Sequence, residues 1–218
     1  AQASEQALAQ LDRRRGDIDA QAVTPAVAVS SLTEIVARLT GLISGISVLS
    51  DDDDISKAII PSCKLTAGKE RAGLERAVVA GGLAAGRFEQ AAYARAMGLA
   101  AAQDSYFGAF RAAASARARA AFDAAMAGPS IDGVVAMRKV VEQGGVGGDF
   151  KGLASKAWFD AATLRIDLLK QVEDALAAEL SELMAGKQAA ATAGLAAVGG
   201  LRPLAMVPCL WIVVARAR

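Results

Sequence analysis

Apolar residues recur at helical spacing along most of the chain. The clearest stripe lies between residues 25 and 49, where apolar residues stand three or one apart: Leu32, Ile35, Val36, Leu39, Leu42, Ile43 and Ile46. This spacing puts them on one face of a helix. Thr24 is a good N-cap and Pro25 suits the first helical position, so the pattern predicts an amphipathic helix that stops near Leu49.

Similar spacing predicts further helices on both sides of this stripe. Three long helices are expected from Ser4 to about Ala20, from about Asp53 to Ala80, and from Phe88 through Phe110. A shorter helix should end at Met126, another should begin after an N-cap at Ser130, and a last one should run from Leu153 onward. For the helix from Asp53 to Ala80, Gly81, Gly82 and Gly86 mark the end, and Pro61 should kink it because proline removes one hydrogen bond of the helix. No stretch alternates as a strand would. The predicted fold class is therefore all-α, with long antiparallel helices in four-helix-bundle packing.

Two polar stretches between these helices are best explained structurally. The run from Asp51 to Asp54 lacks the alternating ligands and glycine turn of a calcium loop. It is typical of an N-cap and first helical turn, where the helix dipole favours acidic residues. The stretch "GGVGGDFKG", Gly144 to Gly152, holds five glycines. It does not end in Gly-Lys-Ser/Thr, as a phosphate-binding loop would, so we expect a linker or a mobile lid.

The last helical pattern carries a stripe close to heptad spacing, formed by Trp158, Ile166, Leu169, Val172, Leu176, Leu180 and Leu183. Beyond it, residues 189–215 contain a single charge, Arg202, and are long enough to cross the hydrocarbon of a bilayer. We predict a transmembrane helix over 189–215 and the start of a cytoplasmic segment at 216–218, whose arginines fit the positive-inside rule. Three residues count against the span: Arg202, Pro203 and Pro208. The alternative is a buried terminal helix of a soluble bundle.

Composition excludes several classes of function. The chain has 218 residues, of which 54% are hydrophobic and 5% aromatic, so its core must consist of thin aliphatic seams between helices. A net charge of +1 gives no global cationic surface for nucleic acid. The absence of histidine removes the usual zinc sites, nucleophile pairs and general base. We therefore predict no metal, no cofactor and no enzymatic activity. Glu70 and Glu75 do not form a catalytic pair of carboxylates, because five residues apart on a helix they point to different faces.

The two cysteines and the start of the chain add little to the functional prediction. Cys63 and Cys209 lie in different contexts, so no disulfide framework is expected. The chain begins with alanine and a polar stretch rather than a signal peptide. We expect it to be a piece of something longer.

The charged stretch "KERAGLERAVVAGG" contains the first candidate site. Lys69, Gly73 and Arg76 lie at i, i+4 and i+7 and share one helix face. Arg71 has Glu75 four residues on as a partner. Arg76 has no acidic residue three or four positions away, and it stands beside a glycine that allows a close approach by another backbone or a small ligand.

Arg138 in "VVAMRKVV" is the second candidate. Valines flank it, and Glu142 is the single acidic residue near enough on the same helix. An unpaired guanidinium on a core-facing stripe is costly. Each of Arg76 and Arg138 should therefore meet a carboxylate from another helix or bind an anion, and spacing alone favours the ion pair.

Residues 69–110 resemble the central part of the nitrate- and nitrite-sensing domain family. The residues that carry the resemblance are Lys69, Glu70, Gly73, Glu75, Arg76, Gly86, Arg87, Phe88, Gln103 and Phe110. The sequence "MRKV" and the helix from Trp158 to Leu180 are similar to later parts of the family. The resemblance covers roughly residues 8–186.

This resemblance implies a function and a site. The resemblance implies a fold of two packed four-helix bundles. In the family this domain is the extracytoplasmic part of bacterial receptors, sensor kinases and cyclases, or part of soluble transcription antiterminators. Arginines of the family hold nitrate or nitrite between helices. Arg76 and Arg138 match family arginines, so the implied ligand-binding residues are Arg76, Arg138, Gly73 and Lys69. The family's first helix, with its Gln-x-Glu-Arg-Gly motif, is missing; "LDRRRGDID" is similar, but Arg15 fits the following family helix better.

We therefore predict that residues 1–188 form the sensory domain of a bacterial transmembrane receptor, a chemotaxis receptor or sensor kinase. It would detect nitrate or nitrite outside the inner membrane and signal by helix displacement. Expected partners are the anion, a second copy through the long helices and the membrane through the C-terminal segment, with no nucleic acid. The alternative is a helical dimerisation module with a degenerate ligand site.

Overall fold

The computed structural model describes the backbone of residues 2–49 and 52–216 and the side chains within 9–24, 27–41, 45 and 52–194. The backbone so described forms seven helices and no strand: α1 (Gln2–Asp19), α2 (Pro25–Leu49), α3 (Asp53–Ala84), α4 (Gln90–Ala113), α5 (Ala116–Ala125), α6 (Pro129–Gly144) and α7 (Ser155–Arg216). The all-α prediction is confirmed. The chain divides into two units, residues 1–177 and 178–218.

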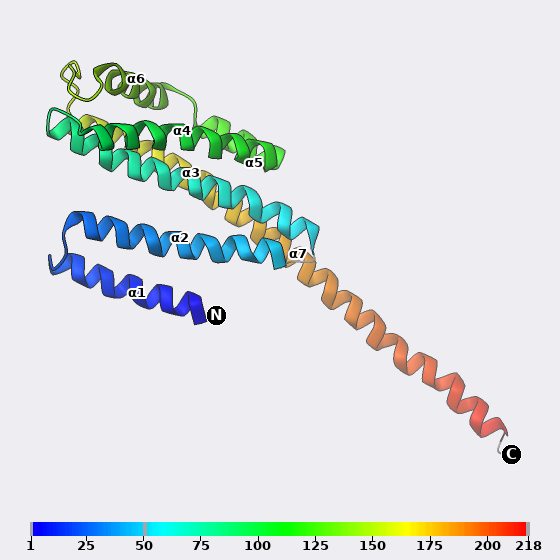
Figure 1. Ribbon diagram of the computed structural model, residues 1–218. Helices are drawn as coiled ribbons and strands as arrows, with labels where there is room; N and C mark the ends of the chain where they lie inside the picture. The colour runs from blue at the N-terminus through cyan, green and yellow to red at the C-terminus, as the bar shows by residue number, and fades with distance from the viewer. Residues whose placement is uncertain (1, 50–51, 217–218) are drawn as a thin grey trace. The chain divides into compact units, whose positions relative to one another are not determined.

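The first unit contains α1 to α6 and the beginning of α7. Within it, α1 contacts α2, α2 contacts α3, and α3 contacts α4 (Figure 1). The acidic run caps a helix as expected, because the Asp52 carboxylate accepts hydrogen bonds from the backbone N–H groups of Asp54 and Ile55. Asp53 and Asp54 lie in the first turn of α3, where acidic side chains complement the dipole.

The end of α3 differs from the prediction. Gly81 and Gly82 do not terminate the helix, which continues to Ala84 and is followed by Gly86 at a φ of +68°. Gly82 is needed inside the helix because the ring of Phe88 packs against it, where an added Cβ would lie 2.2 Å from a ring carbon. The helix also runs through Pro61, which is buried.

One expectation about the later segments is corrected. Gly128, not Ser130, is the N-cap of α6, because Pro129 has the fixed φ that suits the first turn. The glycine-rich loop after α6 is tied to the core: Phe150 is buried, and the backbone N–H of Phe88 donates to the carbonyl of Val146 at 2.7 Å.

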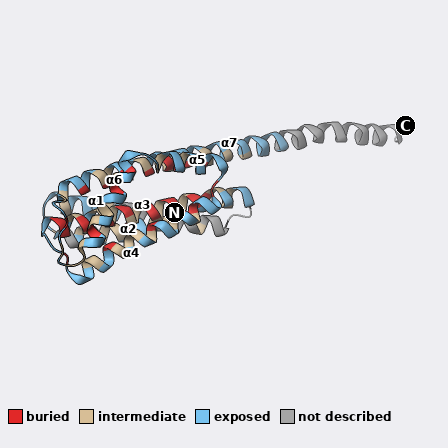
Figure 2. Ribbon diagram, turned by 90° about the horizontal axis from the view of Figure 1, so that it is seen from above, coloured by how far each residue is buried: buried red, intermediate tan, exposed pale blue. Residues whose placement is uncertain are grey.

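The core of the first unit consists of two apolar clusters. One gathers aromatic rings from α4 and α5 with aliphatic residues of α3 and α7, with Phe107, Phe110, Phe122, Leu65 and Leu169 among its members. The other surrounds Trp158 and Phe88 and includes Val79, Val134 and Phe150. Figure 2 shows the buried residues as patches along these helices.

The second unit contains the rest of α7, and no residue of 178–194 is buried. The helix continues without a break to Arg216, so residues 189–215 do not form a separate helix. Within the described part of the chain, no helix combines the length and apolar character needed to cross a membrane. Most of the predicted transmembrane segment, from residue 195 on, lies outside the residues whose side chains are described.

Candidate functional site

A cluster of polar side chains is buried where α3, α4, α6 and α7 meet. Each helix supplies one member: Glu75 from α3, Gln103 from α4, Arg138 from α6 and Arg165 from α7. Glu75 is 3% exposed, Gln103 0% and Arg165 8%. Buried polar groups of this kind are costly unless they are hydrogen-bonded to one another, and these are.

Arg138 meets a carboxylate from another helix. Its Nε and Nη2 lie 2.6 and 2.5 Å from the two oxygens of Glu75, which makes a two-pronged ion pair between α6 and α3. The expectation that Arg138 forms an inter-helix ion pair is confirmed. Its assignment as a ligand-binding residue is not tested by this pairing and stays a prediction.

The Glu75 carboxylate is therefore not available to Arg71. The predicted pair between Arg71 and Glu75 is wrong: Arg71 lies 3.0 Å from Glu70 and stacks on the ring of Tyr106. The reason is that Glu75 lies on the buried side of α3, while Arg71 is on its half-exposed side.

Gln103 joins the two arginines to the carboxylate. Its Oε1 accepts from Arg138 Nη2 at 2.8 Å and from Arg165 Nη1 at 2.6 Å. Its Nε2 donates to Glu75 Oε2 at 2.8 Å and to the carbonyl of Leu99 at 3.0 Å. The amide orientation follows from this network, since the reverse orientation would turn its NH₂ group toward two cations.

Arg165 is the cation with the fewest partners in the cluster. Among the described residues its single hydrogen bond is the one to Gln103, and its guanidinium lies 5.7 Å from the centre of the Phe107 ring. Burial, and then the nearby charge of Arg138, lowers the pKa of Arg165 to about 10. Arg165 is still protonated at neutral pH. The buried Arg165 and the partly buried Arg138 thus face one buried carboxylate, so the four residues of the cluster carry one excess positive charge; the nearby charge of the exposed Asp104 acts on Arg165 in the opposite sense.

The cluster borders a cavity of about 370 Å³ among α4, α5, α6 and α7. Arg138 and Arg165 line it together with apolar side chains that include Phe107, Phe122 and Val135. Arg111 also lines it, although its Nε is paired with Asp123 at 2.9 Å. A cationic wall next to apolar surface is suited to a small anion, because low polarity strengthens charge interactions.

The four residues predicted from sequence do not converge on one place. Arg138 lies in the buried cluster. Lys69 is paired with Glu173 of α7, and its assignment as a ligand-binding residue stays a prediction. Gly73 has open space where a Cβ would lie.

Arg76 contacts α7 at a different position from the buried cluster. Its guanidinium stacks 4.5 Å from the centre of the Phe159 ring and donates to Thr163 Oγ1 at 2.8 Å, and its buried Nε has no partner. No ion pair to Arg76 is found among the described residues, so the inter-helix ion pair that spacing favoured for Arg76 is wrong: its partners on α7 are Thr163 and the Phe159 ring, not a carboxylate.

Arg165 was missed by sequence reasoning, although a signal was present. The buried residues of α7 follow alternate spacings of four and three: Trp158, Ala162, Arg165, Leu169, Val172 and Leu176. Arg165 occupies a core position of this heptad. A charged residue at such a position is the feature that would have identified it.

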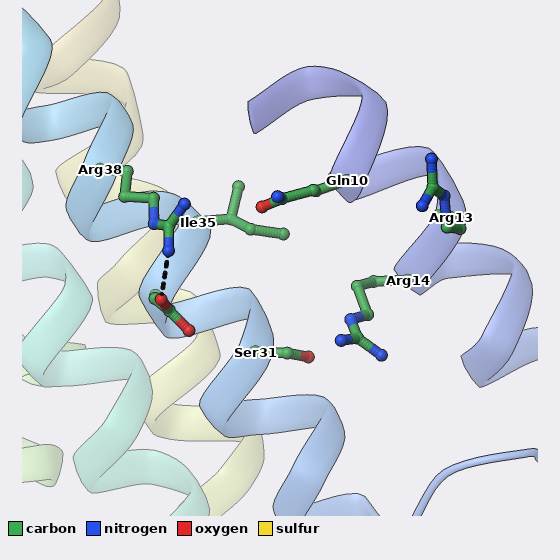
Figure 3. Close-up of a pocket in the computed structure, with 7 residues that line it drawn as sticks. Gln10, Arg13, Arg14, Ser31, Ile35 and Arg38 are labelled. Carbon is green, nitrogen blue, oxygen red and sulfur yellow. Dashed lines mark hydrogen bonds and ion pairs between the residues drawn. The ribbon is translucent and has the colours of Figure 1, made fainter. Parts of the chain in front are cut away.

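A second cleft, of about 360 Å³, lies between α1 and α2 (Figure 3). Arg14 and Arg38 line it, but Arg14 is paired with Asp17 at 3.2 Å and Arg38 with Glu34 at 2.6 Å. All four side chains are more than a third exposed, so solvent and salt screen their charges. This cleft is the weaker candidate for binding an anion.

Comparison with known proteins identifies the family to which the chain belongs. A family model described as nitrate and nitrite sensing matches residues 1–181, and the chain belongs to this family. Among solved structures, the chain is similar to the NasR transcription antiterminator, with 25% sequence identity and a TM-score of 0.70. The similarity covers 81% of this chain and 47% of that one, so the chain spans about half the length of the antiterminator structure. A search of curated proteins found no match.

Proposed function

We propose that this nitrate- and nitrite-sensing domain binds its anion at the cavity beside Arg138 and Arg165. The observation that carries the proposal is the buried charge balance: arginines from α6 and α7 converge on Gln103, and Glu75 is the one carboxylate bonded within the cluster. An anion in the cavity neutralises the remaining positive charge. Without an anion, burial disfavours the charged form of Arg165, as its lowered pKa indicates.

The chemistry of nitrate and nitrite suits such a site. Both are small, planar, singly charged anions whose oxygens match the fork of a guanidinium group. The ring of Phe107 and the side chain of Val135 provide apolar surface beside the arginines. Chloride has the same charge but cannot accept two parallel hydrogen bonds on separate oxygens, so we expect it to bind more weakly.

Arg76 and Gly73 remain a second proposed position for the anion. The unpartnered Nε of Arg76 and the open space at Gly73 favour it. The contact with Thr163, which already occupies one guanidinium nitrogen, makes this position the less favourable of the two.

For signalling, we propose that the anion draws α6 and α7 together. Arg138 and Arg165 belong to these two helices, and α7 continues from the site to Arg216. A ligand that binds one packing of the helices better than another shifts the population toward it. A small displacement of α7 would then carry the signal.

For the full protein, we propose a receptor anchored in the bacterial inner membrane by residues 189–215, with the sensory part outside the cytoplasm and two copies joined through their long helices. The apolar composition of this run supports the proposal. A regulator of transcription is the second candidate, favoured by the similarity to a transcription antiterminator. Fractionation of the full protein separates the two, because a receptor is extracted by detergent and a soluble regulator is not retained in membranes.

A thermal melt with sodium nitrate, sodium nitrite or sodium chloride tests the binding proposal. A ligand present at about 100 times its dissociation constant stabilises the folded state by about 2.7 kcal/mol, which raises a melting temperature by several degrees. We expect the rise with nitrate or nitrite to be lost in Arg165→Met and kept in Arg76→Met. Methionine keeps much of the side-chain volume and removes the charge, and because Arg165 bonds to the neutral Gln103 its loss leaves Glu75 paired with Arg138.

The same melt distinguishes the alternative, a dimerisation module with a degenerate site. A cooperative melt that ignores both anions in the wild-type chain would favour the module. A shift lost in Arg76→Met but kept in Arg165→Met would move the site to the face of α3 that contacts Phe159.

A further inference from the structure

We propose that the cavity beside Arg138 and Arg165 also binds small aromatic monocarboxylates, with benzoate as the simplest example, in competition with nitrate. This inference rests on the proposed function, because it uses the same two arginines. It adds a second class of ligand, an anion with a flat apolar body.

The size of the cavity is the first argument. Nitrate has four heavy atoms and is much smaller than the cavity; a water molecule, with one heavy atom, takes about 30 Å³ in the liquid. The cavity has about 370 Å³, within the range of pockets that hold organic ligands. A nitrate ion bound at the arginines therefore leaves most of the cavity to water.

The walls of the remaining space are apolar. Phe107 of α4, Phe122 of α5, and Ile131 and Val135 of α6 line the cavity. Val135 is 43% exposed, so part of this surface is in contact with water when the cavity is unfilled. A ligand that covers it gains about 25 cal/mol for each Å² of apolar surface removed from water.

The charges select a monoanion. A carboxylate accepts two parallel hydrogen bonds from a guanidinium, as nitrate does. The cluster has an excess of one positive charge, from Arg138 and Arg165 against Glu75. Asp104 also lines the cavity; its carboxylate offsets part of this excess and disfavours a dianion more strongly than a monoanion.

Gly108 offers a way to fill the apolar part without changing the arginines. It lines the cavity on α4, it is exposed, and an added Cβ would meet no atom within 4 Å. Leucine is a better helix former than glycine, so Gly108→Leu should fold at least as well as the wild type. Gly98→Leu is the matched control, because Gly98 is also exposed on α4 with open space around it and does not line the cavity.

The test is calorimetric titration of the 218-residue chain with benzoate, benzamide and nitrate. We expect benzoate to bind and to compete with nitrate, and benzamide, which has the same ring without the charge, to bind at least about tenfold more weakly. Gly108→Leu should weaken benzoate by about tenfold, which corresponds to about 1.4 kcal/mol. It should change nitrate affinity by less than about threefold, and Gly98→Leu should change neither.

The outcomes separate this inference from the proposed function. Nitrate binding that depends on Arg165, without binding of benzoate, overturns the inference and leaves the function in place. Equal affinity for benzoate and benzamide, or unchanged benzoate affinity in Gly108→Leu, also overturns it. If neither nitrate nor benzoate binds the folded wild-type chain, both proposals are wrong.

Discussion

Gln103 Oε1 lies 2.6 Å from Arg165 Nη1 and 2.8 Å from Arg138 Nη2, and the glutamine is completely buried. A neutral amide thus holds two arginines together at a position where a glutamate would fit in nearly the same space. With glutamate, two carboxylates would balance the two cations. With glutamine, one positive charge remains, and the cavity beside it is suited to an anion.

The first prediction concerns this glutamine. Gln103→Glu should reduce nitrate affinity at least about tenfold, because the added carboxylate neutralises the cluster. The melting temperature without anion should fall, because the new carboxylate replaces the Nε2 donor with an oxygen that faces Glu75 Oε2 and the Leu99 carbonyl. Calorimetric titration with nitrate measures the first effect and a thermal melt the second.

Gln90→Glu is the control, because Gln90 is exposed at the start of the same helix, where a carboxylate is favourable. It should leave nitrate affinity unchanged. Equal nitrate affinity in Gln103→Glu and wild type would show that the cluster charge does not determine binding.

The second prediction separates stability from binding. Arg138→Met leaves Glu75 buried without its ion-pair partner, which should lower the free energy of unfolding by about 3–5 kcal/mol. Arg38→Met removes an exposed ion pair with Glu34 and should change the free energy of unfolding by less than about 1 kcal/mol. Urea unfolding followed by circular dichroism compares the two variants, and similar midpoints would argue against the buried pair.

The third prediction concerns pH. Burial lowers the pKa of Arg165 to about 10, so the folded protein loses this proton at a pH where a free arginine keeps it. Above pH 10 the unfolded state therefore binds more protons than the folded state, and the Arg165 contribution to stability increases as pH rises. Nitrate affinity should change in the opposite direction, because the cation that attracts the anion is lost.

Titration with nitrate from neutral pH to about pH 10.5 measures how nitrate affinity depends on the charge of Arg165. Half of Arg165 is neutral at its pKa, so affinity should fall by about twofold near pH 10 and further above it. Because nitrate favours the charged form, its binding should also cause proton uptake at this pH. Affinity that stays constant through pH 10.5 would contradict a role for the Arg165 charge.

The fourth prediction tests the packing around Phe88. Gly82→Ala would place a Cβ 2.2 Å from the Phe88 ring, and overpacking of this kind costs about 1–3 kcal/mol of stability. Gly81→Ala meets no atom within 4 Å and should stabilise the helix by about 0.5–1 kcal/mol. The two variants differ by one position, and thermal melts with the same sign of shift in both would contradict the structure here.

Much of the helical architecture could be predicted from the sequence because hydrophobic spacing and caps are local signals. Thr24 and Pro25 gave the start of α2, and Asp52 caps α3. The end of α3 was misplaced at Gly81 and Gly82, because packing of the Phe88 ring rather than backbone preference explains Gly82, and the helix continues to Ala84.

The candidate site was predicted only in part, because spacing along one helix does not show which residues of other helices it contacts. The cost of an unpaired Arg138 indicated a partner on another helix, but spacing along one helix could not show that the partner is Glu75. Local spacing instead paired Glu75 with Arg71. Arg165 was hidden in a stripe read as continuous apolar surface, and its importance depends on three other helices that meet at Gln103.

A crystal structure of the protein grown with nitrate would show where the anion binds. We expect a planar anion in the cavity, with its oxygens within hydrogen-bond distance of the Arg138 and Arg165 guanidinium groups. A nitrate ion bound instead beside Arg76, or in the cleft between α1 and α2, would show that the proposed site is wrong.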